Sequence, residues 1–161
     1  MVTSATLKNL TDTMKMMAAA ERLVGDFYRD CAEIWEEDGA FWLEIAAEEE
    51  KHATQLERMA QILTLKPERF ETGRPFNRTG IQTFMNGIEG LRQRLKEGMI
   101  TRERAVFAAR DVEASVLEKC YHEFLRTSDT EYLTLVNGIT QETGDHKDRI
   151  EKRIQELKAG R

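Results

Sequence analysis

The two prolines of the chain, Pro67 and Pro75, lie close together near the middle of the sequence and leave long stretches without proline on either side. Proline breaks the interior of a helix, so these stretches can form long uninterrupted helices. They are rich in Ala, Glu, Leu, Lys, Arg and Met at helical spacing, and no segment alternates Val, Ile or Thr with polar residues as a half-buried strand does. The sequence therefore predicts an all-α chain.

Capping residues and glycines set the expected boundaries of the first two helices. We expect one helix from a cap at residues 11–13 to about residue 38, where Gly39 stops it. A second helix is expected over residues 40–65. The next stretch, residues 66–78, holds both prolines and is too long for a simple hairpin, so we expect a crossover along a bundle.

The second half of the chain repeats this pattern. We expect a minor helix over residues 81–96, a break at Gly98, and a third long helix from a cap at Thr101 to about residue 126. A capping box over residues 128–131 opens a fourth helix. The expected fold is a single domain, residues 1–161, that forms an antiparallel four-helix bundle of two hairpins joined by a long crossover.

The charge balance and the cysteines limit which partners and which cellular location are expected. The 24 basic and 29 acidic residues give a formal net charge of −5 with no long run of one sign, which argues against nucleic acid or an anionic membrane as a partner. Cys31 and Cys120 form no Cys-x-x-Cys pair, which favours a reducing cytoplasmic setting. We find no signal peptide, and the apolar stretches fall short of the about 20 residues that span a bilayer.

Each of the four long helices places an acidic residue on its apolar face, at 100° per residue. Two of the helices add an imidazole about one turn along, three residues later in the second helix and four residues later in the fourth. Carboxylates buried together at one level are costly unless cations lie between them. The inward set is Glu21, Glu49, His52, Glu113, Glu142 and His146.

Metal ions would satisfy this set directly. A Glu from each of two helices and a Glu with a nearby His from each of the other two is the arrangement that holds two iron or manganese ions in bundle cores. Mixed carboxylate and imidazole ligands suit these metals better than metals that prefer thiolates. The sequence predicts a two-metal site for two Fe ions, with Mn or Zn as alternatives.

The fourth helix is less regular than the second. Three residues before His146 stands Thr143 rather than Glu, and Asp145 is expected to project off the apolar stripe. We therefore pair Glu142 with His146, although Gly144 between them weakens the helix locally. The sequence therefore leaves open two alternatives for the second metal position, that it binds metal weakly and that it is vacant.

Residues beside this set have simpler expected roles. Glu48 and Glu50 should project to the flanks and be solvated. Tyr28 is the candidate catalytic residue beside the ligands, as a hydrogen-bond donor or electron donor, with core packing as the alternative. Cys120, opposite Tyr28, is expected to pack as a small hydrophobic residue. Arg110 could pair with an inward acid if no metal binds.

Two motifs resemble the rubrerythrin group of the ferritin-like superfamily over about residues 11–157. They are Glu21 followed by the Asp-Phe-Tyr of residues 26–28, and the Ala-Glu-Glu-Glu-Lys-His-Ala of residues 47–53. The resemblance implies a ferritin-like di-iron bundle that acts on hydrogen peroxide or oxygen, with the same six residues as ligands. Bundles of this kind commonly pair, so a homodimer is the expected assembly.

The chain departs from rubrerythrins in two respects. Two cysteines cannot build a rubredoxin-like Cys₄ iron domain, so an unknown external reductant would be required. Rubrerythrins also carry an extra carboxylate one turn from the third-helix Glu, where this chain has Arg110 and Val116. Two alternatives therefore remain, a ferroxidase or iron-handling protein with the same ligands, and a non-catalytic helical module with a degenerate site.

Overall fold

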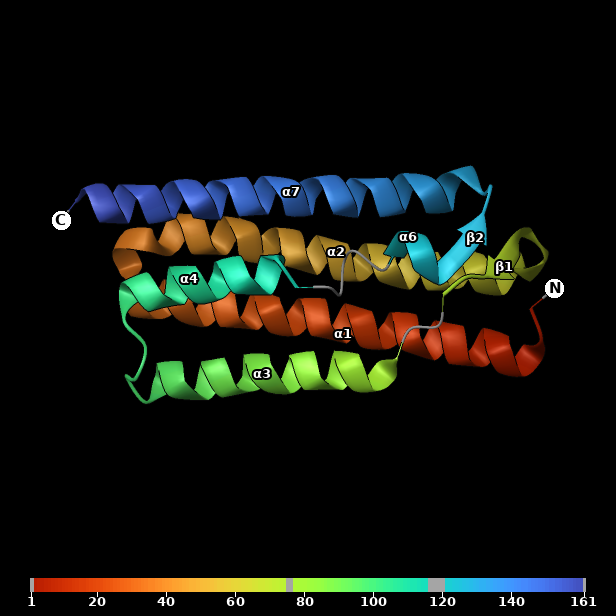
Figure 1. The fold of residues 1–161 in the computed structure, drawn as a ribbon, viewed down its shortest axis with the longest axis horizontal. Helices are drawn as coiled ribbons and strands as arrows, with labels where there is room; N and C mark the ends of the chain where they lie inside the picture. The colour runs from red at the N-terminus through yellow and green to blue at the C-terminus, as the bar shows by residue number, and fades with distance from the viewer. Residues whose placement is uncertain (1, 75–76, 116–120, 161) are drawn as a thin grey trace.

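The computed structural model describes residues 2–74, 77–115 and 121–160. Over these residues the chain is almost entirely helical, which confirms the prediction of an all-α chain (Figure 1). Within the described ranges, the helices of twelve residues or more are α1 (Ser4–Ile34), α2 (Gly39–Leu65), α3 (Arg78–Lys96), α4 (Arg102–Glu113) and α7 (Thr130–Ala159). The shorter helical turns are η1 (Glu36–Asp38), η2 (Pro67–Arg69) and α6 (Tyr121–Phe124).

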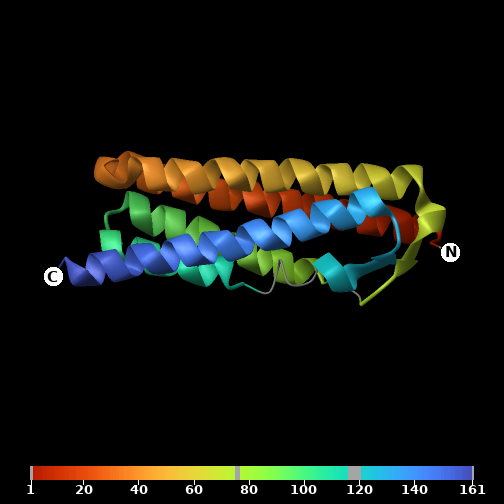
Figure 2. The same ribbon diagram turned by 90° about the horizontal axis from the view of Figure 1, so that it is seen from above.

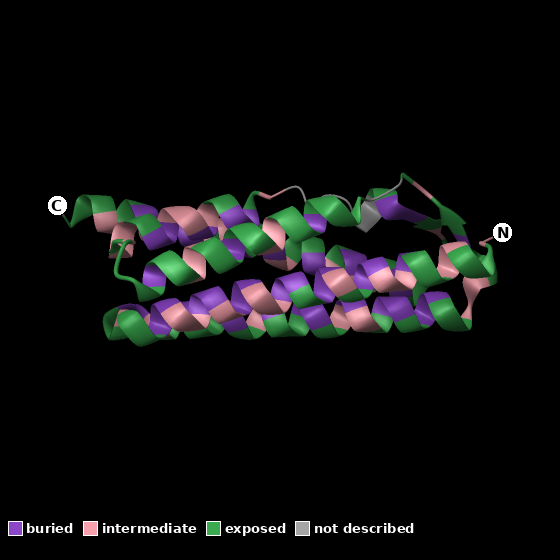
Figure 3. Cartoon of the chain, turned by 90° about the horizontal axis from the view of Figure 1, so that it is seen from below, coloured by how far each residue is buried: buried purple, intermediate pink, exposed green. Residues whose placement is uncertain are grey.

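The long helices lie along one common axis (Figures 1 and 2). Helices α1 and α2 form an antiparallel pair joined by η1, and α7 packs against both α2 and α4. Helix α3 packs along α1. Buried residues recur along the inward side of each helix, between exposed ones, as amphipathic helices require (Figure 3). None of these helices, over the described residues, is long and apolar enough to cross a membrane.

The apolar core is divided into two clusters along this axis. On α1 one cluster ends at Ala20 and the other begins at Val24; on α2 the corresponding limits are Ala46 and Ala53. On α7 the two clusters are separated by the residues between Ile139 and Ile150. The buried residues Glu21, Glu49, His52, Thr143 and His146 of these three helices therefore lie at one level, between two apolar regions.

The beginning of α1 differs from the prediction. The helix starts at Ser4, because the side chain of Thr3 caps it by accepting a hydrogen bond from the Thr6 amide at 3.2 Å. The predicted cap at residues 11–13 is wrong. There the hydroxyls of Thr11 and Thr13 donate to carbonyls of the preceding helical turn, at 3.1 and 2.8 Å, and so remain inside the helix.

The end of α1 and the end of the third long helix also differ from the prediction. Helix α1 ends at Ile34, and Gly39 is the first residue of α2 rather than a stop signal. Helix α4 begins at the predicted cap, where the hydroxyl of Thr101 accepts from the Arg104 amide at 3.2 Å. It ends at Glu113, short of residue 126. The predicted core positions Val116, Leu117 and Cys120 lie outside the described residues.

A short antiparallel ribbon was not predicted. Strand β1 (Phe70–Thr72) pairs with β2 (Leu125–Thr127), so the segment before α7 is held to the segment after α2. The hydroxyl of Thr127 donates to the Arg69 carbonyl at 2.8 Å, and the side chains of Phe70 and Leu125 are buried. This pairing replaces helix at residues 125–127.

Helix α7 begins one residue later than the predicted capping box allows. Its cap is Asp129, whose side chain accepts from the Tyr132 amide at 3.0 Å and pairs with Lys66 and Arg69. Because these cations come from the segment after α2, the cap also fixes the start of α7 against that segment.

A buried carboxylate joins three helices at the opposite end of the molecule. Asp38, just before α2, accepts hydrogen bonds from Arg102 at the start of α4, at 2.5 and 2.8 Å, and from Arg153 of α7. Its side chain is 1% exposed, whereas the two arginines reach solvent. Removal of one partner from such a group leaves charges without compensation.

We expect Asp38→Ala to lower the free energy of unfolding by about 2–4 kcal/mol, because two arginines lose their shared acceptor. The matched control is Glu37→Ala, which removes an exposed carboxylate 3.7 Å from Arg102 and should change stability by less than about 0.5 kcal/mol. Urea unfolding of both variants measures the difference. Equal midpoints for the two variants would contradict a joining role for Asp38.

Candidate metal centre

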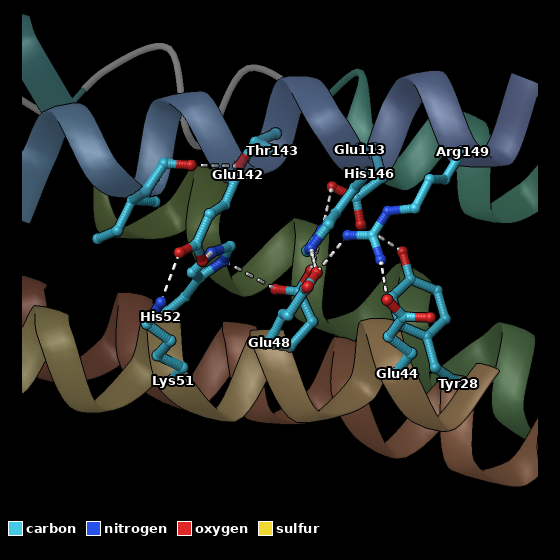
Figure 4. A network of polar contacts seen from close by, with 12 residues as sticks. Tyr28, Glu44, Glu48, Lys51, His52, Glu113, Glu142, Thr143, His146 and Arg149 are labelled. Carbon is cyan, nitrogen blue, oxygen red and sulfur yellow. Dashed lines mark hydrogen bonds and ion pairs between the residues drawn. The ribbon is translucent and has the colours of Figure 1, made fainter. Parts of the chain in front are cut away.

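The level between the two apolar clusters holds acids and imidazoles from four helices, and Figure 4 shows residues of α2, α4 and α7 among them. Helix α1 contributes a glutamate, α2 a glutamate and a histidine, α4 a glutamate at its last residue, and α7 a histidine. All five side chains are nearly inaccessible to solvent, with 2% exposure at most. They are Glu21, Glu49, His52, Glu113 and His146.

These five residues form two groups suited to metal binding. Glu21, Glu49 and His52 each place one possible ligand atom within 4.8 Å of the others, and so do Glu49, Glu113 and His146. Glu49 belongs to both groups, so the two groups adjoin. The side chains thus outline two neighbouring positions that share one carboxylate.

The Nδ1 atoms of both histidines face the carboxylates. His52 Nδ1 lies 3.5 Å from Glu49 Oε2, and His146 Nδ1 lies 3.0 Å from Glu49 Oε1 and 3.5 Å from Glu113 Oε2. The two rings stack with centroids 5.4 Å apart. In the described part of the chain, neither Nδ1 atom nor Glu113 Oε2 has a well-aligned hydrogen bond, although the carboxylates of Glu49 and Glu113 interact with the His146 ring. Buried polar atoms in this state call for a partner, and a cation fits them.

Glu142 lies on the outer side of this cluster. Its Oε2 is 2.8 Å from His52 Nε2 and its Oε1 is 2.5 Å from Lys51 Nζ. Burial opposes the charge of Glu142, but the hydrogen bonds from Lys51 and His52 outweigh burial and lower the pKa of its carboxyl. Among the described residues Glu142 belongs to neither metal-binding group. The structure therefore brings five of the six predicted ligands together.

Glu48 is in contact with the other histidine, contrary to the prediction that it is only solvated. Its Oε2 contacts both His146 Nε2 and Arg149, and Arg149 also pairs with Glu44 at 3.0 Å. Neither Glu48 nor Arg149 is among the site residues predicted from the sequence. The available signal was spacing, since Arg149 follows His146 by three residues and so lies on the same side of α7.

Tyr28 contacts a member of the cluster. Its hydroxyl donates to Glu113 Oε1 at 2.6 Å, which agrees with the predicted hydrogen bond to a ligand residue. The ring is fully buried against Trp42, with centroids 5.6 Å apart. Tyr28 therefore both packs in the core and holds the carboxylate of Glu113.

Other predicted neighbours stay away from the cluster. Arg110 lies 3.6 Å from Asp111 and over the ring of Phe107, so it does not neutralise the inward acids. Glu50 pairs with Arg22 on the surface, and Asp145 is exposed as expected. Thr143 is buried one turn before His146, and its hydroxyl donates to the Ile139 carbonyl at 2.9 Å.

The carboxylates control the charge of His146. Burial alone would lower its pKa, but the nearby carboxylates of Glu113 and Glu49 outweigh burial and raise the pKa of His146 to about 11. At neutral pH without metal this ring is therefore an imidazolium. Since the folded-state pKa exceeds the ordinary 6.5, this charge stabilises the metal-free fold fully below about pH 6.5, and the contribution falls as pH rises toward 11.

The donor set fits a hard or borderline metal ion. Carboxylate oxygens and imidazole nitrogens are ligands for iron, manganese and zinc, and the cluster contains no thiolate. Comparison with protein-family models, curated proteins and solved structures gave no match. The assignment of a possible metal centre therefore rests on the geometry of these residues.

The metal content of variants should show that Glu49 belongs to both groups. We expect about two equivalents of metal per chain in the unaltered protein, about one in Glu21→Gln or Glu113→Gln, and none in Glu49→Gln, because only Glu49 serves both groups. Elemental analysis after dialysis measures this, with Glu50→Gln as the matched control on the same helix. Retention of metal by Glu49→Gln would contradict a shared carboxylate.

Metal binding should also depend on pH. Coordination by Nδ1 requires the neutral ring of His146, so binding at neutral pH must release at least one proton. We expect the Zn²⁺ affinity to rise about tenfold per pH unit between about pH 6 and 8. Calorimetry in buffers of different ionisation enthalpy counts the released protons. An affinity independent of pH would show that Zn²⁺ does not bind at this ring.

Proposed function

We propose that the chain is a rubrerythrin-like member of the ferritin-like superfamily that reduces hydrogen peroxide or oxygen at a di-iron centre, with electrons from an external donor. In this proposal α1, α2, α4 and α7 are the four helices of the bundle, and α3 lies within the crossover. The observation that carries the proposal is the pair of buried three-residue groups that share Glu49. A carboxylate shared in this way would help to hold two cations.

The residues divide naturally between two ions. Glu21 and His52 would hold one ion, Glu113 and His146 the other, and Glu49 would contact both. The Nδ1 atoms of the two histidines are the expected nitrogen donors, because they face the carboxylates. When bound, two ferrous ions supply the two electrons that convert hydrogen peroxide and two protons into two water molecules.

The protein would contribute exclusion of water and control of protons. The apolar clusters on both sides of the centre separate it from bulk solvent. The Tyr28 hydroxyl keeps its proton and donates a hydrogen bond to Glu113 Oε1, which stabilises the negative charge of that carboxylate. Burial raises the pKa of the Cys31 thiol, so this residue remains a protonated core residue and does not supply electrons. In this proposal the electrons come from another molecule.

The proposal is tested by adding hydrogen peroxide to anaerobic protein loaded with ferrous iron. We expect consumption of about one peroxide for each pair of ferrous ions, with the iron retained after oxidation. Oxidation of many more ferrous ions per chain, with release of ferric iron, would favour the ferroxidase alternative. Protein that binds no iron would favour a non-catalytic helical module.

Tyr28→Phe should slow peroxide consumption about tenfold with metal content unchanged, because Glu113 loses a hydrogen bond while the ring packing remains. The matched control is Tyr132→Phe. Tyr132 is also buried, but its hydroxyl makes no hydrogen bond within the described residues, so this change should leave the rate unaltered. Equal rates for both variants would remove Tyr28 from the mechanism.

A further inference from the structure

We infer that Glu48 and Glu142 are positioning residues that hold the two histidines of the centre in their metal-binding orientation. Neither would bind metal itself. The inference rests on the proposed metal centre and assigns roles to two carboxylates outside both metal-binding groups. It follows from the contacts of the outer ring nitrogens, which face away from the cluster.

The two contacts cross between helices (Figure 4). His52 of α2 is held by Glu142 of α7 at 2.8 Å, and His146 of α7 is held by Glu48 of α2. Each helix therefore provides one histidine and the carboxylate that orients the histidine of its partner. This reciprocity makes the orientation of both rings depend on the packing of α7 against α2.

The direction of both hydrogen bonds follows from the cations outside them. Glu142 also accepts from Lys51 at 2.5 Å, and Glu48 also accepts from Arg149. A carboxylate paired with a cation is ionised and can only accept, so the histidine Nε2 must donate. In a neutral ring that leaves the lone pair on Nδ1, the atom that faces Glu49.

The same contacts argue against Glu142 as a ligand. Both of its oxygens are engaged, one by Lys51 and one by His52, and its side chain is 26% exposed, whereas the members of the two groups are buried. The buried position one turn before His146 is taken by Thr143 instead. A carboxylate that holds the outer nitrogen of a ligand histidine fixes the ring and raises its basicity, and its loss typically lowers metal affinity about 10–100-fold.

The test uses protein with ¹⁵N-labelled histidine, metal-free and loaded with Zn²⁺. We expect Glu142→Leu to speed exchange of the Nε2 proton of His52 and leave His146 unchanged, and Glu48→Leu to do the reverse. Each change should lower Zn²⁺ affinity about 10–100-fold. Glu142→Gln, whose amide oxygen still accepts a hydrogen bond, should restore slow exchange and two equivalents of Zn²⁺.

The matched control is Glu50→Leu, which removes a carboxylate of α2 that pairs with Arg22 on the surface. It should alter neither ring, although it removes the same charge from the same helix. Far-UV circular dichroism checks that each variant folds. If Glu48→Leu or Glu142→Leu does not fold, the glutamine variant at that position replaces it. The glutamine variant is then expected to keep slow exchange of the histidine Nε2 proton and to bind two equivalents of Zn²⁺.

Three outcomes separate this inference from the proposed function. If Glu142→Gln loses one equivalent of Zn²⁺, as Glu21→Gln is expected to, Glu142 is a ligand and the inference is wrong. If the leucine variants change the wrong ring or neither ring, the inference also fails, whatever the activity with peroxide. If Zn²⁺ binds and the crossed pattern appears but iron-loaded protein does not reduce peroxide, only the proposed function fails.

Discussion

A buried carboxylate loses most of its hydration, and the chain collects Glu21, Glu49 and Glu113 at one level between two apolar clusters. The cations that could neutralise them stay outside: Lys51 and Arg149 reach only the outer carboxylates. Inside the cluster, the His146 imidazolium balances only part of the charge of the three carboxylates in the metal-free protein. This excess of negative charge is unfavourable for a purely structural core and suited to binding metal cations. The packing of the surrounding helices holds the carboxylates together.

The buried positions of these residues could be predicted because burial on an amphipathic helix follows from the pattern of that helix alone. Glu21, Glu49, His52 and His146 each lie on an apolar stripe that a period of 3.6 residues identifies, and each is buried in the structure. The same reasoning placed Arg110 only at the edge of its stripe, and there it faces away from the acids.

Other features depend on contacts between distant segments, which helical periodicity does not contain. Glu48 and Glu142 sit at stripe edges, and the packing of α7 on α2 decides whether such residues reach a histidine or solvent. The short ribbon depends in the same way on the pairing of β2 with β1, which lies far earlier in the chain. At residues 11–13 the error was local, because a threonine hydroxyl can bond within a helix as well as cap one.

The two metal-binding groups differ in how much of the chain they require. Glu21, Glu49 and His52 all belong to the α1 and α2 pair, whereas the second group adds Glu113 and His146 from α4 and α7. During synthesis the residues of the first group are all present once the first hairpin has been made. The second forms only after α7 has been made and has docked. A nascent chain thus contains the residues of one group first, and the residues of both groups come together only in the finished protein.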